Sequence, residues 1–275
     1  MNQSLSVNRG RLSVLVGLVI LTFSLLPLIQ APSAGSVTTS FLGTPVQIEL
    51  TGATIVLLLV TVLTCAGVDM LVRDHPLVRR GVVARTFPYW IIPGLTVVVA
   101  SQLLNQVNSG GMWIMGLFIT ALLLAGVILA EYATIDPEGP FASRARLFLT
   151  AMAYVLAMLL FALIWNTRDR SILSAPLTFI FVAGLAFDLL YATQPAPRRV
   201  ALLAVTIGLV LAEGNWAINY WRSNVFVAAI AQLLAFYALV VLAGQYLLDR
   251  INRRVLIEFA VVMAIAMFLL LREQL

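Results

Sequence analysis

The chain consists mainly of long, continuous apolar runs separated by short polar segments. A run of roughly 17 to 25 apolar residues is long enough to cross about 30 Å of hydrocarbon as an α-helix. Continuous runs disfavour a membrane β-barrel, whose strands alternate apolar and polar positions. We therefore expect an all-α, polytopic integral membrane bundle that forms a single membrane domain over 1–275. The predicted transmembrane helices number nine, near residues 12–31, 51–72, 87–107, 112–133, 147–166, 172–193, 200–220, 224–248 and 255–271.

Arginine positions predict how these helices are threaded. Basic residues next to membrane helices stay preferentially on the cytoplasmic side. With the N-terminus placed in the cytoplasm, thirteen of the 17 arginines fall on that side, and four, Arg168, Arg170, Arg222 and Arg272, fall on the other. The asymmetry supports nine helices with a cytoplasmic N-terminus, independently of hydropathy.

The first apolar run is predicted to be a signal anchor that stays in the chain. Arg9 and Arg11 precede it, as in a signal peptide, but the run is longer than a usual signal core and "QAPSAG" lacks a clean cleavage site. Cleavage, the alternative, would leave eight helices. The next segment, "APSAGSVTTSFLGTPVQIELTG", is rich in Pro, Gly, Ser and Thr, and we expect a loop on the outer side.

Composition confirms the membrane as the solvent and excludes several classes of site. Hydrophobic residues make up 61% of the chain and charged residues 11%, far from the balance of soluble domains. All basic residues are arginines in short connections, so the net charge of +5 is explained by topology and not by nucleic acid. Cys65 and His75 are the sole cysteine and histidine, so we expect no metal site, and without lysine neither a P-loop nor a retinal Schiff base forms. We expect no cofactor.

One helix carries an unusual polar stretch, "LVLAEGNWAINYWRSN", near its outer end. Glu213 lies about two turns inside the boundary, where an ionisable group is costly unless it faces protein or water. Helical spacing puts Trp216 on the face of Glu213, and Asn215 and Asn219 on a neighbouring face. We expect these residues to line a polar outer vestibule. Polar or aromatic residues predicted at the same height are possible partners: Arg168, Arg170, Asn105 and Trp165.

Simpler explanations of this stretch stay open. Trp216 belongs equally well to an interfacial aromatic belt, and Glu213 to a set of hydrogen bonds between neighbouring helices. Asp188 lies deeper in the inner half of its helix than the other carboxylates and is the second candidate.

Three functions are compatible with these residues. The first is passive or secondary transport, or ligand binding, with Glu213 as a titratable group and Asp188 as a second relay point. The second is a membrane-embedded enzyme on a lipid or isoprenoid substrate, with Asp136 and Glu138 or Glu213 as acid or base. The third is a noncatalytic subunit or scaffold that binds other membrane subunits. The expected location is the cell membrane, of the bacterial inner-membrane type, with the lipid bilayer as the main partner and no nucleic acid.

Overall fold

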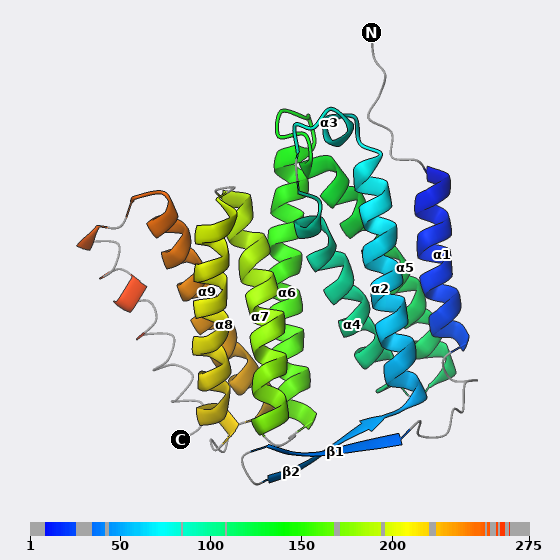
Figure 1. The fold of residues 1–275 in the computed structure, drawn as a ribbon, viewed down its shortest axis with the longest axis vertical. Coiled ribbons are helices and arrows are strands. Elements are labelled where there is room, and N and C mark those ends of the chain that lie inside the picture. Colours follow the sequence, from blue (N-terminus) through cyan, green and yellow to red (C-terminus); the bar gives the residue numbers. More distant parts are fainter. Residues whose placement is uncertain are drawn as a thin grey trace. The chain divides into compact units, whose positions relative to one another are not determined.

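The fold is known from a computed structural model (Figure 1). It describes residues 9–25, 35–41, 44–83, 85–107, 109–167, 171–193, 196–219 and 224–250, and scattered positions between 252 and 264. The chain divides into two compact units, residues 1–146 and 147–275, called here the first and the second unit. Each unit is described by itself.

Seven helices of the described residues are long and apolar enough to cross a membrane. Within the described residues the count is therefore seven, and not the predicted nine. The first predicted run, 12–31, overlaps α1 (Arg9–Leu25), a helix of 17 residues, and positions 26–31 of that run lie outside the described residues. The last predicted run, 255–271, lies mostly outside the described residues.

The first unit is built on four packed helices: α1, α2 (Gly52–Arg73), α4 (Ile91–Leu104) and α5 (Gly110–Thr134). A short helix, α3 (Pro76–Arg79), and a 3-10 turn, η2 (Phe87–Trp90), connect α2 to α4. The predicted helices near 51–72, 87–107 and 112–133 thus lie within a few residues of the observed ones.

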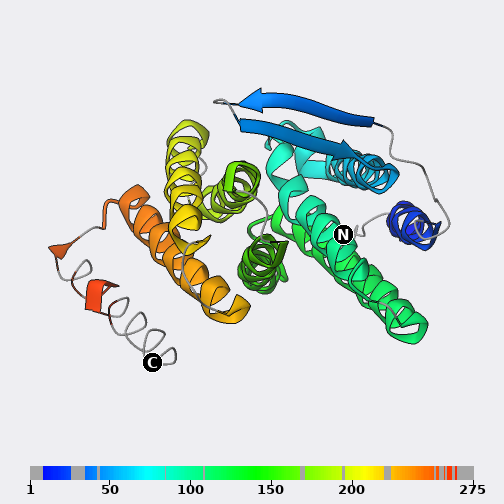
Figure 2. The same cartoon turned by 90° about the horizontal axis from the view of Figure 1, so that it is seen from below.

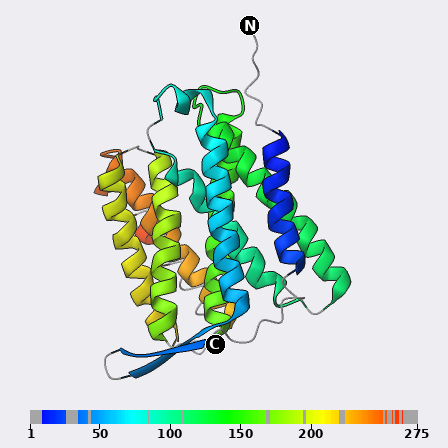
Figure 3. The same cartoon turned by 45° about the vertical axis from the view of Figure 1, so that its right-hand side comes forward.

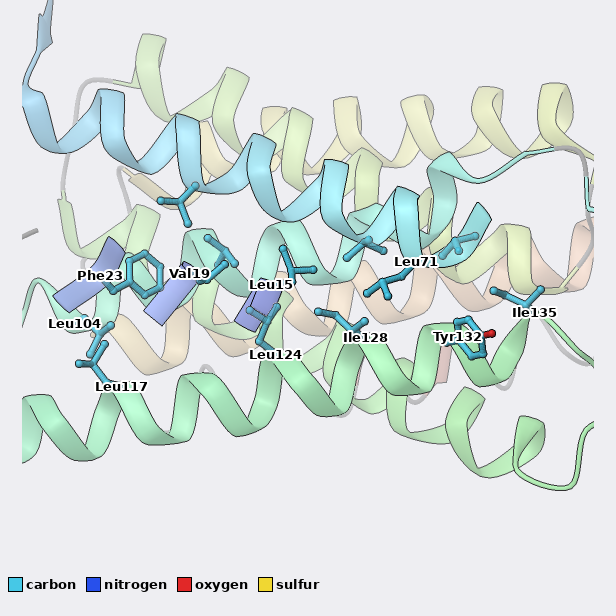
Figure 4. Packing of buried hydrophobic residues seen from close by; sticks show 14 residues of the cluster. Leu15, Val19, Phe23, Leu71, Leu104, Leu117, Leu124, Ile128, Tyr132 and Ile135 are labelled. Carbon is cyan, nitrogen blue, oxygen red and sulfur yellow. The ribbon is translucent and has the colours of Figure 1, made fainter. Parts of the chain in front are cut away.

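Side-chain spacing explains which face of each helix is buried. On α1, the buried residues Leu15, Val19 and Phe23 recur every four positions and so form one stripe. Figure 4 shows this stripe facing apolar side chains of the neighbouring helices, among them Leu124 of α5. Gly67 of α2 lets Leu15 approach, because a Cβ there would lie 2.4 Å from its Cδ1 atom. The outward faces carry exposed Leu and Val, as lipid contact requires.

The segment predicted as an outer loop contains a β-hairpin, so that prediction is corrected. Strands β1 (Gly35–Phe41) and β2 (Thr44–Leu50) pair antiparallel, from Gly35 opposite Leu50 to Phe41 opposite Thr44 (Figure 2). Val37, Thr39 and Phe41 stand at every second position of "SVTTSF", and the apolar residues of "PVQIEL" do the same; this two-residue period is that of a strand. The Pro, Gly and Ser content concealed this period.

The second unit consists of most of α6 (Ala142–Thr167) and of α7 (Ser171–Thr193), α8 (Pro197–Asn219) and α9 (Val225–Leu247). Helices α7 and α8 lie side by side along their length (Figures 1 and 3). Gly208 allows this close approach, because a Cβ on it would lie 3.0 Å from the Phe179 carbonyl oxygen and from Ala183 Cβ. Aromatic contacts join α6 to α9, with ring centroids 5.8 Å apart for Tyr154 and Phe236.

Candidate functional site

The polar stretch of α8 is divided between two faces of the helix. Glu213 is exposed and Trp216 is 55% exposed, whereas Asn215 is 1% exposed. Residues two apart on an α-helix lie about 200° apart, so burying one exposes the other. The structure therefore does not bring Glu213 and Asn215 to one wall. The side chain of Asn219, and both Arg168 and Arg170, lie outside the described residues.

Asn215 joins three helices of the second unit through side-chain hydrogen bonds. Its Nδ2 atom donates to Ser174 Oγ of α7 at 3.0 Å, and its Oδ1 atom accepts from Gln232 Nε2 of α9 at 2.9 Å. All three side chains are at most 3% exposed. We call Ser174, Asn215 and Gln232 the amide cluster. It is a set of neutral donors and acceptors inside an apolar bundle.

The amide cluster keeps one hydrogen-bonding position unused. Among the described residues, no donor reaches Gln232 Oε1, although this atom is buried. A buried carbonyl oxygen without a donor is unfavourable by roughly 1 to 3 kcal/mol. Gln232 Oε1 can therefore accept a hydrogen bond from one further donor, such as a hydroxyl, an N–H group or water.

The buried face of α7 extends from the amide cluster to Asp188. Thr178 is fully buried and donates to the Ser174 carbonyl oxygen at 2.8 Å, so its hydroxyl is satisfied within the helix. Asp188, 6% exposed, lies about four turns from Ser174 on the same face, on the order of 21 Å along the axis. Val182 and Leu185, both buried, lie between them. Two polar layers are thus separated by an apolar one.

The remaining predicted partners are distributed over both units. Trp165 is 7% exposed and belongs to α6 in the second unit. Asn105 is exposed and ends α4 in the first unit, where its backbone N–H donates to the Ser101 carbonyl oxygen at 3.0 Å. The sequence drew attention to neither Ser174 nor Gln232. A lone glutamine in the apolar run "AAIAQLLAF" was the available signal.

A second polar cluster lies at the arginine-bearing end of the first unit. Asp74 accepts from Arg11 and, at 2.9 Å, from Arg79. Asp69 accepts from Arg73 at 2.5 Å and from Thr86 Oγ1 at 2.6 Å. These carboxylates hold the end of α2 to its neighbours in the unit.

His75 follows Asp74 in the chain and is 1% exposed. Its Nδ1 atom accepts from Leu77 N at 3.2 Å and caps α3, while its ring meets Tyr132 edge on, with centroids 4.7 Å apart. Burial lowers the pKa of His75, and the negative charge of Asp136 opposes that shift. The neutral ring is the form that can accept the capping hydrogen bond.

Of the two turn carboxylates, Asp136 has a local structural contact. Asp136 Oδ1 accepts from Glu138 N at 3.2 Å, a local turn contact, while Glu138 is exposed. Within the described ranges, no three His, Cys, Asp or Glu side chains gather in a way that would hold a metal ion.

Comparison with known proteins gives a family. Residues 32–272 match the model of DUF5656, described as a protein of unknown function. The match covers most of the chain, so the chain belongs to this family. No curated protein and no solved structure matches it.

Proposed function

We propose that this multi-pass membrane protein of the DUF5656 family is a transport or ligand-binding protein, and that its second unit holds the binding residues. The observation that carries this proposal is the amide cluster, in which three helices contribute buried, neutral polar side chains to one point. Polar groups inside a membrane bundle are costly and are usually functional.

Each polar residue then has a role. Asn215 and Ser174 orient the amide of Gln232, whose free oxygen accepts a hydrogen from a small polar ligand. Asp188 is the second relay point, in the inner half of the unit. The apolar layer of Val182 and Leu185 separates the two points and limits leakage between them.

Water access to the amide cluster tests the proposal. In a Cys65→Ser background, which has no other cysteine, Asn215→Cys is treated in membranes with an impermeant maleimide. The matched control is Leu211→Cys, because Leu211 is 3% exposed and lies one turn away on the same face of α8. We expect Asn215→Cys to react faster, and a panel of small solutes to contain one that slows the reaction. Equal, slow labelling of both variants would contradict a ligand path.

A second function is favoured by a separate observation, the exposure of Glu213. Its neighbours on the exposed face, Leu209, Val210 and Trp216, are apolar and 46 to 55% exposed. A carboxylate on such a face is expensive in lipid, and a partner helix carrying a donor would cover it. The chain is then a subunit of a membrane complex.

Native gels of membranes solubilised in mild detergent test this second function. Glu213→Leu should release the chain from a larger complex. Glu138→Leu, which removes an exposed carboxylate outside the spans, should leave the complex intact. An unchanged complex, or a monomer in every sample, would speak against a subunit role for Glu213.

A further inference from the structure

We propose that the turn after α3 is a docking site for anionic phospholipid headgroups. This basic turn comprises Arg79, Arg80, Gly81, Val82 and Arg85 of the first unit. Its phosphate-binding chemistry is independent of the amide cluster, so the proposal does not rest on the function proposed above.

The backbone of the basic turn is fixed by hydrogen bonds. Gly81 has a φ of 73°, a left-handed conformation that suits glycine. Its N–H donates to the Val78 carbonyl oxygen at 2.9 Å, and Val82 N donates to the Leu77 carbonyl oxygen at 3.0 Å. These two bonds form the motif that closes a helix C-terminus around a left-handed residue. The arginines that flank Gly81 are therefore presented from a defined backbone.

An ion pair and the buried histidine anchor the turn to the residues before it. His75 caps the other end of α3, and Asp74 accepts from Arg79. Arg80 and Arg85 are exposed, and within the described part of the chain neither pairs with a carboxylate. Two guanidinium groups thus remain for an external anion, and the planar guanidinium matches a phosphate with two parallel hydrogen bonds.

The position of the turn in the chain matches the depth of lipid headgroups. The turn lies between two candidate membrane spans, since Arg79 comes six residues after the end of α2 and Arg85 two residues before Phe87. Val82, between the arginines, is 69% exposed, and Phe87 is 38% exposed. Apolar side chains beside exposed arginines suit the boundary between acyl chains and phosphates better than the surface of a soluble acidic partner.

Charge at this end of the first unit supports an anionic surface as the partner. Arginines outnumber carboxylates there, and one of those carboxylates, Glu131, is 2% exposed. The arginines of the first unit are Arg9, Arg11, Arg73, Arg79, Arg80, Arg85, Arg144 and Arg146. Clusters of arginine next to a membrane helix are attracted to anionic lipid, and the attraction is screened by salt.

Native mass spectrometry of the full chain released from detergent tests the proposal. We expect adducts of phosphatidylglycerol to exceed those of phosphatidylcholine several-fold, and the excess to vanish in Arg80→Gln/Arg85→Gln. The matched control is Arg198→Gln/Arg199→Gln, which removes two exposed, adjacent arginines from the start of α8 and should keep the excess. Equal adducts of the two lipids, or an equal loss in the control, would overturn the proposal.

Further measurements distinguish lipid phosphate from soluble phosphate and control for misfolded variants. Inorganic phosphate at millimolar concentration should not displace phosphatidylglycerol; displacement would assign the turn to a soluble phosphate ligand instead. An acidic protein that co-purifies through Arg80 and Arg85 while lipid selectivity is unchanged would also refute lipid docking. Arg80→Lys/Arg85→Lys keeps the charge and should retain part of the excess, and Val82→Asp should reduce it even if the glutamine variant fails to fold.

Discussion

The close contact between α7 and α8 can be tested by adding one methyl group at each of two glycines of α8, Gly208 and Gly214. A Cβ on Gly208 would lie 3.0 Å from the Phe179 carbonyl oxygen and 3.1 Å from Phe179 Cδ2, whereas a Cβ on Gly214 would meet nothing within 4 Å. Both positions lie in α8, so Gly208→Ala and Gly214→Ala gain the same intrinsic helix preference.

The expected magnitudes follow from this geometry. Replacing glycine by alanine in a helix stabilises it by roughly 0.5 to 1 kcal/mol. At Gly214 nothing offsets that gain. At Gly208 the methyl group meets a backbone oxygen, which cannot rotate away, and overpacking costs typically about 1 to 3 kcal/mol. We expect Gly214→Ala to raise the free energy of unfolding by up to about 1 kcal/mol, and Gly208→Ala to lower it by about 1 to 2 kcal/mol.

Reversible unfolding in mixed micelles with increasing dodecyl sulfate measures both variants against the natural chain. The quantity that tests the reasoning is the difference between the two variants, because the helix-propensity gain cancels in it. Gly208→Val should widen the difference, since a larger side chain meets the same carbonyl. If both alanine variants stabilise the protein equally, α7 and α8 do not approach each other at Gly208 as described.

Three further changes test other parts of the structure. A double-mutant cycle of Asn215→Ala and Gln232→Ala should give a coupling energy of about 0.6 to 1.7 kcal/mol, the range for hydrogen bonds between membrane helices. A control cycle of Asn215→Ala with exposed Thr206→Ala should be additive. A zero coupling energy in the first cycle would disprove the contact. The pKa of folded His75 lies below its usual 6.5, so the unfolded chain binds the proton more tightly. The contribution of neutral His75 to the free energy of unfolding is therefore fully present above pH 6.5. It is lost as the pH drops through 6.5 toward the folded pKa. Thermal melting between pH 8 and 5 should show this loss in the natural chain and a smaller one in His75→Asn, which keeps a capping side chain; identical pH profiles would refute the assignment. Gly81→Ala should destabilise the protein by about 1 kcal/mol through its positive φ, seen as a lower melting temperature, whereas Gly110→Ala, with open space around it, should not.

Most helices of the fold could be predicted, since apolar length alone determines where a chain crosses lipid. The predicted run 224–248 became α9, Val225–Leu247, and 172–193 became α7, Ser171–Thr193. Asn224 caps α9 by accepting from Val227 N at 2.8 Å, so even this helix start is marked by a polar residue. The hairpin of β1 and β2 was missed because residue composition was weighed above the alternation of Val37, Thr39 and Phe41.

The candidate site was predicted less well than the fold. Periodicity separates the faces of α8, but it does not say which face packs against α7 and α9. Asn215 is the buried residue of its stretch, and its partners Ser174 and Gln232 lie 41 and 17 residues away in the chain. At Gly208 the buried face lies against Phe179 and Ala183 of α7, and this fit is a property of the packed pair of helices and not of either helix alone.

Buried threonine hydroxyls of both units bond within their own helix, as Thr178 does in the second unit, whereas the amide cluster of the second unit bonds between helices. In the first unit, Thr64, Thr96 and Thr120 each donate to a carbonyl oxygen four residues earlier in their own helix. Such bonds persist if a whole helix slides along its neighbours. The amide cluster does not allow that freedom, because a shift of α9 by one turn would carry Gln232 about 5 Å away from Asn215. The alignment of α7, α8 and α9 along their axes therefore depends on three side chains as well as on packing.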